Sequence, residues 1–329
     1  MTDPCAEGMR LAVGQVNELT EEHLLFTRQC GLSEILMNTP KLPGDERWEY
    51  EDLARLVERA ESFGVRLICI ENVPVRFVKD IMLGKPGREK QLDNMQYTVR
   101  NMGRAGIPIL GYNWMPNGVW RTEKNLAIRG GAVSNSFTLS LAADLPNTED
   151  RTYSAEEMWE NHRWYMERIL PVCEEAGVRM ALHPDDPPVQ MLGGVARIFG
   201  SFDGFRTAME SHPSPMHGLD FCHGCWSEMR GGEGVLDAIE FFGREGRIFY
   251  VHMRDVQGCA DDFCECFIDE GNSDILAVVR KLKEVGFRGF IIDDHVPRFV
   301  NDSPYGHRGR AYALGYLKAL LQVVNSDSA

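Results

Sequence analysis

The chain has 329 residues, of which 43% are hydrophobic and 26% are charged, a composition typical of a globular protein with a sizeable core. Its 49 acidic and 35 basic side chains give a net charge of -14, which disfavours nonspecific binding to nucleic acid or to an anionic membrane. No apolar run approaches the roughly 18 residues of a membrane span, and "MTDPCAEGMRLAVGQ" at the start lacks the pattern of a secretory signal. We therefore expect a cytoplasmic protein without nucleic-acid or membrane partners.

Eight short apolar and β-branched runs, each followed by polar residues or by Gly and Pro, predict buried strands. In chain order they are "MRLAV" near 9–13, "SEILMN" near 33–38, "VRLICIEN" near 65–72, "IPILGYN" near 107–113, "VRMALH" near 178–183, "MHGLDFC" near 216–222, "RIFYVHMRD" near 247–255 and "FRGFIIDDH" near 287–295. Amphipathic patterns such as "YEDLARLVERAESFG" and "SDILAVVRKLKEVG" lie between them and predict helices. Strands that alternate with helices favour a parallel sheet, and eight repeats favour a closed (β/α)8 TIM barrel.

The stretch from about 113 to 150 follows the fourth predicted strand and is too long for a typical loop between a strand and a helix. We expect this insertion to cover the mouth of the barrel or to mediate a subunit contact, and we therefore expect a homo-oligomer. The sequence contains no low-complexity tract and no Gly/Ser linker that would mark a second domain. Residues 1–329 are therefore expected to form a single catalytic domain.

The last four predicted strands end in residues that can bind a metal. They supply His183, Cys222, His252 and the adjacent pair Asp294 and His295. Because the carboxyl ends of barrel strands converge on one face, residues far apart in sequence can meet there. Two imidazoles, a thiolate and a carboxylate are ligands for a divalent transition metal. Each residue alone is more commonly a turn residue, a buried thiol or a helix cap, but their recurrence at equivalent strand ends favours a shared metal site.

The nine cysteines do not predict a disulfide framework, because their number is odd and they are scattered through a long chain. The fragments "CHGC" and "CEC", which contain Cys225, Cys264 and Cys266, lack the paired spacing of a structural zinc module. We interpret these three cysteines as packing or incidental thiols.

Six segments, taken in order, resemble the mannonate dehydratases over residues 9 to about 322. They are "ALHPDDPP", "HGLDFCHG", "FYVHMRDV", "CFIDEGN", "DDHVP" and "PYGHRGRAYALGYLKAL". The resemblance implies a xylose-isomerase-like barrel that removes water from D-mannonate to give 2-keto-3-deoxy-D-gluconate, a step of hexuronate (glucuronate) catabolism. It also implies a divalent metal, usually Mn²⁺, on His183, Cys222, His252 and Asp294, with Fe²⁺, Co²⁺, Mg²⁺ and Zn²⁺ as alternatives.

The resemblance further implies that His295 and a tyrosine of the following segment handle protons. One group removes the proton at C2 of the substrate and the other protonates the C3 hydroxyl as it leaves. Tyr305 in "PYGHRGR" is the first choice for the tyrosine, and Tyr312 is its competitor. The sequence does not assign the two proton steps to particular residues.

Arginine and asparagine side chains are candidates for holding the sugar acid. Arg254, Arg308 and Arg310 could pair with the substrate carboxylate, since guanidinium groups bind carboxylates in a bidentate manner. Asn72 and Asn113 end the third and fourth predicted strands and could hydrogen-bond hydroxyl groups.

Three acidic residues are not assigned a role in the site, because each also allows a structural interpretation. Glu71 could face the barrel or cap a helix. Asp269 and Glu270 favour a solvated loop, because the whole protein is acidic.

Two other functions compete with dehydration. A sugar isomerase or epimerase on the same barrel would usually bind its metal through several carboxylates. The thiolate of Cys222 argues against such a ligand set. A noncatalytic metal- or sugar-binding protein would hold its metal in a closed site with no open coordination position.

Overall fold

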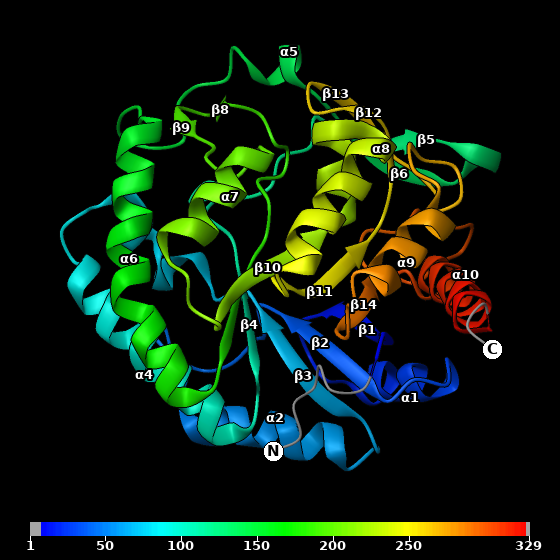
Figure 1. Ribbon diagram of the computed structural model, residues 1–329, viewed down its shortest axis with the longest axis horizontal. Coiled ribbons are helices and arrows are strands. Elements are labelled where there is room, and N and C mark those ends of the chain that lie inside the picture. The colour runs from blue at the N-terminus through cyan, green and yellow to red at the C-terminus, as the bar shows by residue number, and fades with distance from the viewer. Residues whose placement is uncertain (1–7, 327–329) are drawn as a thin grey trace.

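The computed structural model describes residues 8–326, and within this range eight parallel strands form a closed barrel (Figure 1). The order around the barrel is β1-β14-β11-β10-β7-β4-β3-β2. The strands are β1 (Arg10–Val16), β2 (Glu34–Asn38), β3 (Arg66–Glu71), β4 (Ile109–Tyr112), β7 (Arg179–Leu182), β10 (His217–Cys222), β11 (Ile248–Met253) and β14 (Phe290–Asp293). Each coincides with one of the eight predicted runs, although β1 extends three residues beyond its run, so the expected TIM barrel is confirmed.

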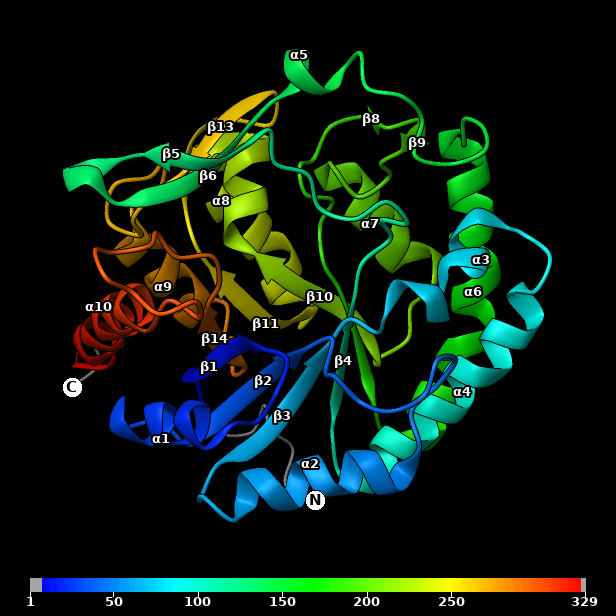
Figure 2. The ribbon, with the colours of Figure 1, turned by 180° about the vertical axis from the view of Figure 1, so that it is seen from behind.

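Helices surround the barrel, as Figures 1 and 2 show from opposite sides. They are α1 (Glu21–Gln29), α2 (Tyr50–Glu61), α3 (Lys79–Leu83), α4 (Arg88–Ala105), α5 (Leu139–Ala142), α6 (Ala155–Ala176), α7 (Phe202–Ser211), α8 (His223–Arg244), α9 (Ile275–Glu284) and α10 (His307–Ser326), with short 3-10 turns at Val75–Phe77 and Arg129–Gly131. In α6, Ser154 and Glu157 form a capping box, and Gly177 ends the helix in a left-handed conformation. No helix in the described residues is both long and apolar enough to cross a membrane.

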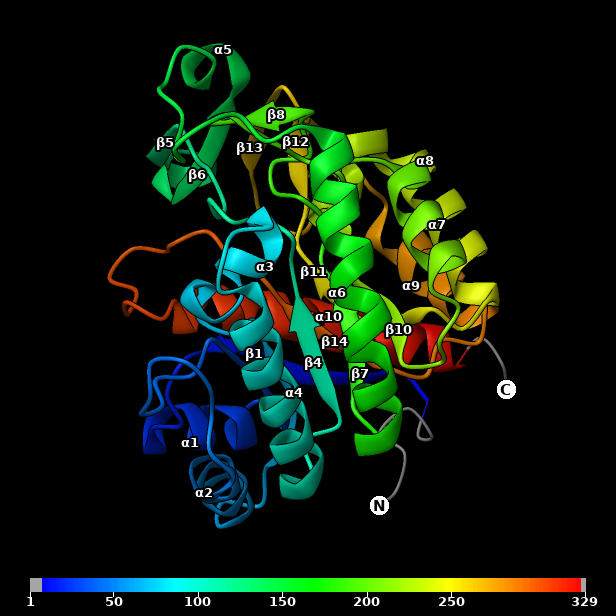
Figure 3. The same cartoon turned by 90° about the vertical axis from the view of Figure 1, so that its left-hand side faces the viewer.

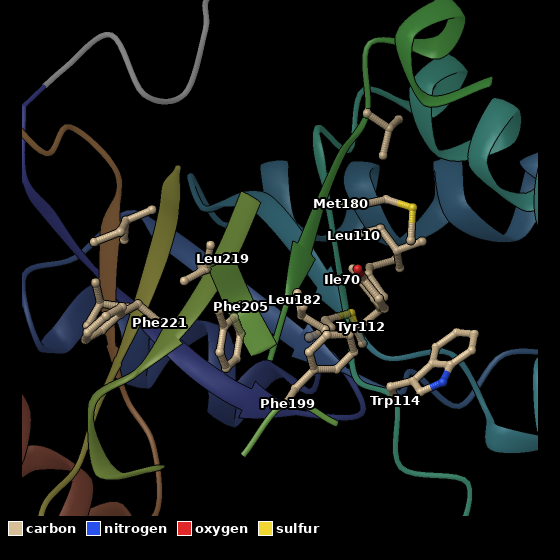
Figure 4. Close-up of a cluster of buried hydrophobic side chains, with 14 of the residues drawn as sticks. Ile70, Leu110, Tyr112, Trp114, Met180, Leu182, Phe199, Phe205, Leu219 and Phe221 are labelled. Atoms are coloured by element: carbon tan, nitrogen blue, oxygen red, sulfur yellow. The ribbon is translucent and has the colours of Figure 1, made fainter. Parts of the chain in front are cut away.

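The strand side chains alternate between two buried layers, because successive residues of a strand point to opposite faces. Small, aliphatic and aromatic residues from several strands, among them Ala12, Ile109, Ala181 and Phe290, pack together as a cluster in the barrel interior. The alternate residues pack against the surrounding helices, and Figure 4 shows one part of this outer layer. Its labelled residues are Ile70, Leu110, Tyr112, Trp114, Met180, Leu182, Phe199, Phe205, Leu219 and Phe221.

Residues 113–150 contribute to a second sheet with strand order β12-β13-β6-β5. The insertion supplies β5 (Glu123–Ala127) and β6 (Val133–Thr138), and the segment after β11 supplies β12 (Val256–Cys259) and β13 (Asp262–Glu265). Strand β6 pairs with β13 in an antiparallel register, as in the pair Phe137 and Phe263. Figure 3 shows this sheet with α5 and β8 (Met191–Leu192) at one end of the molecule. We call this four-stranded sheet the cap sheet; whether it also contacts another subunit stays a prediction.

Candidate metal centre and active site

The strand alternation directs four predicted ligand residues toward the barrel axis. His183 follows Ala181 by two positions, and Asp294 follows Ile292 by two, so both continue the inward-facing rows of β7 and β14. Cys222 and His252 are direct neighbours in the register of β10 and β11. All four side chains are buried.

These four residues meet at the carboxyl ends of their strands. The ligand atoms of His183, Cys222 and His252 all lie within 4.8 Å of one another. Asp294 adjoins them, since its Oδ2 lies 3.8 Å from Cys222 Sγ and 3.8 Å from His252 Nδ1. The structure therefore brings together residues that are more than a hundred positions apart in the chain.

The two nitrogens of His252 have different surroundings. Nε2 lies 2.8 Å from Glu71 Oε2 and 3.3 Å from Asp220 Oδ2. Nδ1 is buried without a hydrogen-bond partner among the described residues, and it faces Asp294. A carboxylate on one ring nitrogen leaves the other free to bind a metal, which is the usual arrangement at histidine ligands. Glu71 thus faces the barrel, and we infer that it orients this imidazole.

Asp220 is a buried carboxylate of the site that the sequence interpretation missed. It precedes Cys222 by two residues on β10, so strand alternation alone could have indicated its inward direction. Both of its oxygens are buried without a hydrogen-bond partner among the described residues. Burial raises the pKa of Asp220 to about 8, although His252 and His183 oppose the rise.

The acidic groups of the cluster favour a positive charge among the ligand residues. Burial disfavours the charged form of His183, but Asp220 and Cys222 outweigh burial and raise the pKa of this imidazole to about 10. Burial also opposes ionisation of Cys222, yet contacts with Cys225, Arg254 and His183 hold the pKa of its thiol well below the ordinary value. A thiolate, two imidazoles and a carboxylate around one point, with one imidazole nitrogen unpartnered, fit a divalent transition metal.

Arg254 is buried beside this cluster and bonds to acidic groups on several sides. Its guanidinium donates to Asp294 Oδ2 at 3.0 Å, to Glu228 Oε1 at 2.9 Å and to Asp186 Oδ2 at 3.1 Å. It also lies 3.3 Å from Cys225 Sγ. Asp186, Cys225 and Glu228 form a second group with metal-ligand spacing, but the guanidinium already supplies a cation to them. The structure thus shows Arg254 holding Asp294 in place, and its contact with substrate stays a prediction.

His295 lies at the mouth of the barrel with a side chain that is 39% exposed. Its Nδ1 is 2.7 Å from Glu265 Oε1, and its Nε2 is 3.7 Å from Asp294 Oδ1. Glu265 is buried on β13, and although burial opposes ionisation, His295 and Arg121 hold the pKa of this carboxyl well below its ordinary value. Glu265 was not among the predicted site residues, because it lies between Cys264 and Cys266 in "CEC", which was interpreted only through its two cysteines.

The structure places the two candidate tyrosines differently. The Tyr305 hydroxyl donates to the carbonyl of Gly14 on β1 at 2.7 Å, and its ring lies against the Arg310 guanidinium. Tyr312 is 37% exposed, and its hydroxyl accepts from Arg129 of the insertion at 3.5 Å. Tyr305 is therefore the more buried candidate, and the choice between the two stays a prediction.

The two arginines near the C-terminus take separate positions. Arg310 donates to Asp293 Oδ2 at 2.8 Å and to the carbonyl of Asp294 at 3.1 Å. Asp293 points away from the barrel interior, since its neighbours Ile292 and Asp294 point inward. Arg308 is exposed and donates to the carbonyl of Val300, so the structure does not bring Arg308 to the buried cluster.

Asn72 and Asn113 lie side by side at the mouth of the barrel. Asn113 Nδ2 donates to Asn72 Oδ1 at 2.7 Å, and Asn72 Nδ2 donates to Glu71 Oε1 at 3.2 Å. Both line a cavity of about 470 Å³, together with Thr39, Trp114 and other largely apolar side chains. The structure therefore connects both asparagines to the carboxylate that contacts His252.

Fold and site together define the class of the protein as a (β/α)8 barrel with a candidate metal centre at the carboxyl ends of its strands. The fold is similar to a solved L-ribulose 3-epimerase with a TM-score of 0.62, at 13% identity and with 97% of each chain covered. The family model for D-mannonate dehydratase (UxuA) matches residues 13–149 and 147–328, and the chain belongs to this family.

Individual members of the family are similar to this chain along most of their length. A mannonate dehydratase of Streptococcus suis (strain 05ZYH33) is 30% identical over 326 residues, which cover 89% of this chain and 87% of that protein. The mannonate dehydratase of Thermotoga maritima is 27% identical over 328 residues, which cover 86% and 88%. The crystal structure of mannonate dehydratase from S. suis serotype2 matches with a TM-score of 0.89, at 27% identity over 98% of this chain and 97% of that chain. The expected family is therefore confirmed, and the chain is an enzyme of the dehydratase type.

Proposed function

We propose that this enzyme removes water from D-mannonate to give 2-keto-3-deoxy-D-gluconate in hexuronate catabolism. The observation that carries the proposal is the buried cluster of His183, Cys222, His252 and Asp294 in a chain that the mannonate dehydratase family model matches almost throughout. His295 at the rim of this cluster supplies a group that can exchange protons, and although burial opposes the charged form, Asp294 and Glu265 raise the pKa of its imidazole.

The four residues of the cluster would hold a divalent metal, with Mn²⁺ as the first choice. When bound, the metal supplies positive charge that stabilises the negative charge developing on the substrate oxygens as the C2 proton leaves. Fe²⁺, Co²⁺, Zn²⁺ and Mg²⁺ are the alternatives, and the thiolate of Cys222 makes Mg²⁺ the poorest fit because Mg²⁺ prefers oxygen ligands.

His295 is the proposed acceptor of the C2 proton. Its Nδ1 faces the Glu265 carboxylate, so a neutral ring carries its proton on Nδ1 and presents the lone pair of Nε2. Tyr305 is the proposed donor to the departing C3 hydroxyl, which then leaves as water. Burial raises the pKa of the Tyr305 phenol, so this side chain keeps its proton until it is transferred.

Asn72 and Asn113 are the proposed hydrogen-bonding partners of substrate hydroxyls, because they lie at the mouth beside Glu71. Arg254, Arg308 and Arg310 remain candidates for the carboxylate. Arg254 is the one of these three whose guanidinium donates to the side-chain carboxylate of a proposed metal ligand.

A product assay tests the proposed function. Protein loaded separately with each of the five metals is incubated with D-mannonate, and formation of a 2-keto-3-deoxy acid is measured. We expect product with at least one metal, and Mn²⁺ to support the fastest turnover. No product with any metal would overturn the proposal: interconversion of an aldose and a ketose would then indicate an isomerase, and metal binding alone a noncatalytic protein.

Exchange of the proposed thiolate ligand gives a second test that does not need turnover. We expect Cys222→Ser to weaken metal retention by about tenfold or more, because a hard hydroxyl replaces a soft thiolate. Elemental analysis after dialysis measures the metal content. Cys173→Ser is the matched control, since Cys173 is a buried thiol of α6 away from the cluster. A Cys222→Ser protein with full metal content and activity would remove this sulfur from the ligand set.

A further inference from the structure

The carboxylate of Glu265 belongs to the cap sheet but contacts a residue of the barrel. Glu265 ends β13, whereas His295 follows β14, and Glu265 Oε1 lies 2.7 Å from His295 Nδ1. The side chain of Glu265 is 3% exposed, although the imidazole that it contacts is 39% exposed. A buried anion thus contacts one edge of a partly exposed ring.

Two residues of the insertion hold Glu265 in this position. Arg121 donates to Glu265 Oε1 through Nε at 2.9 Å and through Nη2 at 2.6 Å, and Asn135 on β6 donates to Oε2 at 2.8 Å. Arg121 is itself fixed by a bidentate pair with Asp186, at 2.6 Å and 2.8 Å. These bonds leave the Glu265 carboxylate little freedom to follow a rotation of the imidazole.

A fixed carboxylate on one ring nitrogen has two effects on a histidine. It selects the neutral tautomer that carries its proton on the nitrogen facing the carboxylate, so the other nitrogen keeps its lone pair. It also fixes the plane of the ring, and a misplacement of about 1 Å in a reacting group can cost about 10²-fold in rate. For His295 the free nitrogen is Nε2, which faces the proposed metal ligand Asp294.

We propose that Glu265 is a positioning residue that fixes the tautomer and the orientation of His295, and that Arg121 and Asn135 of the insertion clamp Glu265 for this task. The insertion therefore takes part in building the active site. The kinetic consequence rests on the proposed function, whereas the tautomer of His295 does not.

The competing interpretation is that Glu265 only fastens the cap sheet to the barrel. The chain offers a matched control, because Asp269 also binds an arginine of the insertion. Asp269 accepts from both Nη atoms of Arg129, at 2.8 Å and 3.0 Å, at the protein surface. Asp269→Asn removes a link between the insertion and the segment after β11 without touching the Glu265–His295 pair.

Nitrogen NMR of histidine-labelled protein tests the proposal without a substrate, with the His295 signal assigned by its loss in His295→Asn. In the wild type we expect the neutral ring to carry its proton on Nδ1. In Glu265→Gln we expect a mixture of tautomers, because the amide can both donate and accept, and in Asp269→Asn we expect the wild-type signal. A wild-type signal in Glu265→Gln, or an equal change in Asp269→Asn, would overturn the proposal.

Kinetics on D-mannonate then test the consequence for catalysis. We expect Glu265→Gln to lower kcat by about 10²-fold, with KM and metal content close to wild type, and Asp269→Asn to stay near the wild-type rate. Asn135→Ala keeps the Glu265 charge, and we expect it to lower kcat by less than Glu265→Gln does. If Glu265→Gln does not fold, the NMR and the kinetics are measured on Asn135→Ala instead. Equal rates in Glu265→Gln and wild type would reject the positioning role, whereas an inactive wild type with the expected NMR result would reject only the mannonate assignment.

Discussion

Replacing His295 with asparagine is expected to lower turnover of D-mannonate by about 10²- to 10⁴-fold, the usual contribution of a general base or acid. The reason is that Nε2 of His295 is the proposed proton acceptor beside Asp294. Asparagine can still hydrogen-bond Glu265 but cannot accept a proton near neutral pH. Metal content should stay at the wild-type level, because His295 is not one of the four proposed ligands. Steady-state rates and elemental analysis of the same preparation measure both quantities.

His212→Asn is the control for this prediction, since His212 lies after α7, away from the metal cluster, and is also partly buried. We expect this control to keep the wild-type rate. A His295→Asn protein that turns over D-mannonate as fast as the wild type would remove His295 from the proton steps. Loss of metal together with activity would instead indicate that His295 supports the metal site.

Arg254→Met is expected to destabilise the metal-free protein by about 3 to 5 kcal/mol, the usual cost of removing one partner from a buried ionic group. The Arg254 side chain is 1% exposed and bonds to the carboxylates of Asp186, Glu228 and Asp294. Methionine fills much of the volume but leaves these carboxylates buried without their shared cation. Denaturant unfolding in the presence of a chelator measures the free energy of unfolding.

Arg244→Met provides the comparison, because the Arg244 side chain is 59% exposed and pairs with Glu240 on the surface of α8. An exposed ion pair of this kind contributes about 0 to 1 kcal/mol. A similar decrease in the free energy of unfolding of the two variants would show that the Arg254 network does not stabilise the protein as a buried ionic centre.

Much of the fold and the proposed ligand set could be predicted from local patterns. The eight buried runs and the helices between them indicated a barrel, because regular alternation of strand and helix has few other stable solutions. His183, Cys222, His252 and Asp294 could be selected because each stands at the end of such a run. Both inferences depend on residues close together in the chain, together with a general rule that strand ends converge.

The surroundings of these residues could not be predicted in the same way. Arg310 lies in a segment that resembles the mannonate dehydratases and is a candidate for the substrate carboxylate, yet the structure pairs it with Asp293 on the outward side of β14. Arg254 is likewise a candidate for the carboxylate, but its donors point to Asp294, Glu228 and Asp186. Which partner a long charged side chain selects depends on all the groups within its reach, and these come from separate elements.

The sequence by itself determined the barrel and the residues at its strand ends, since hydrophobic period and strand punctuation are local properties of the chain. Only the tertiary structure decided that β6 pairs with β13, that Asn135 of β6 and Arg121 of the insertion both reach Glu265, and that Glu265 contacts His295. Arg121 and Glu265 are 144 positions apart. Pairing of this kind leaves no periodic signal in either segment, because it is selected by the burial and charge of two surfaces that come from segments far apart in the chain.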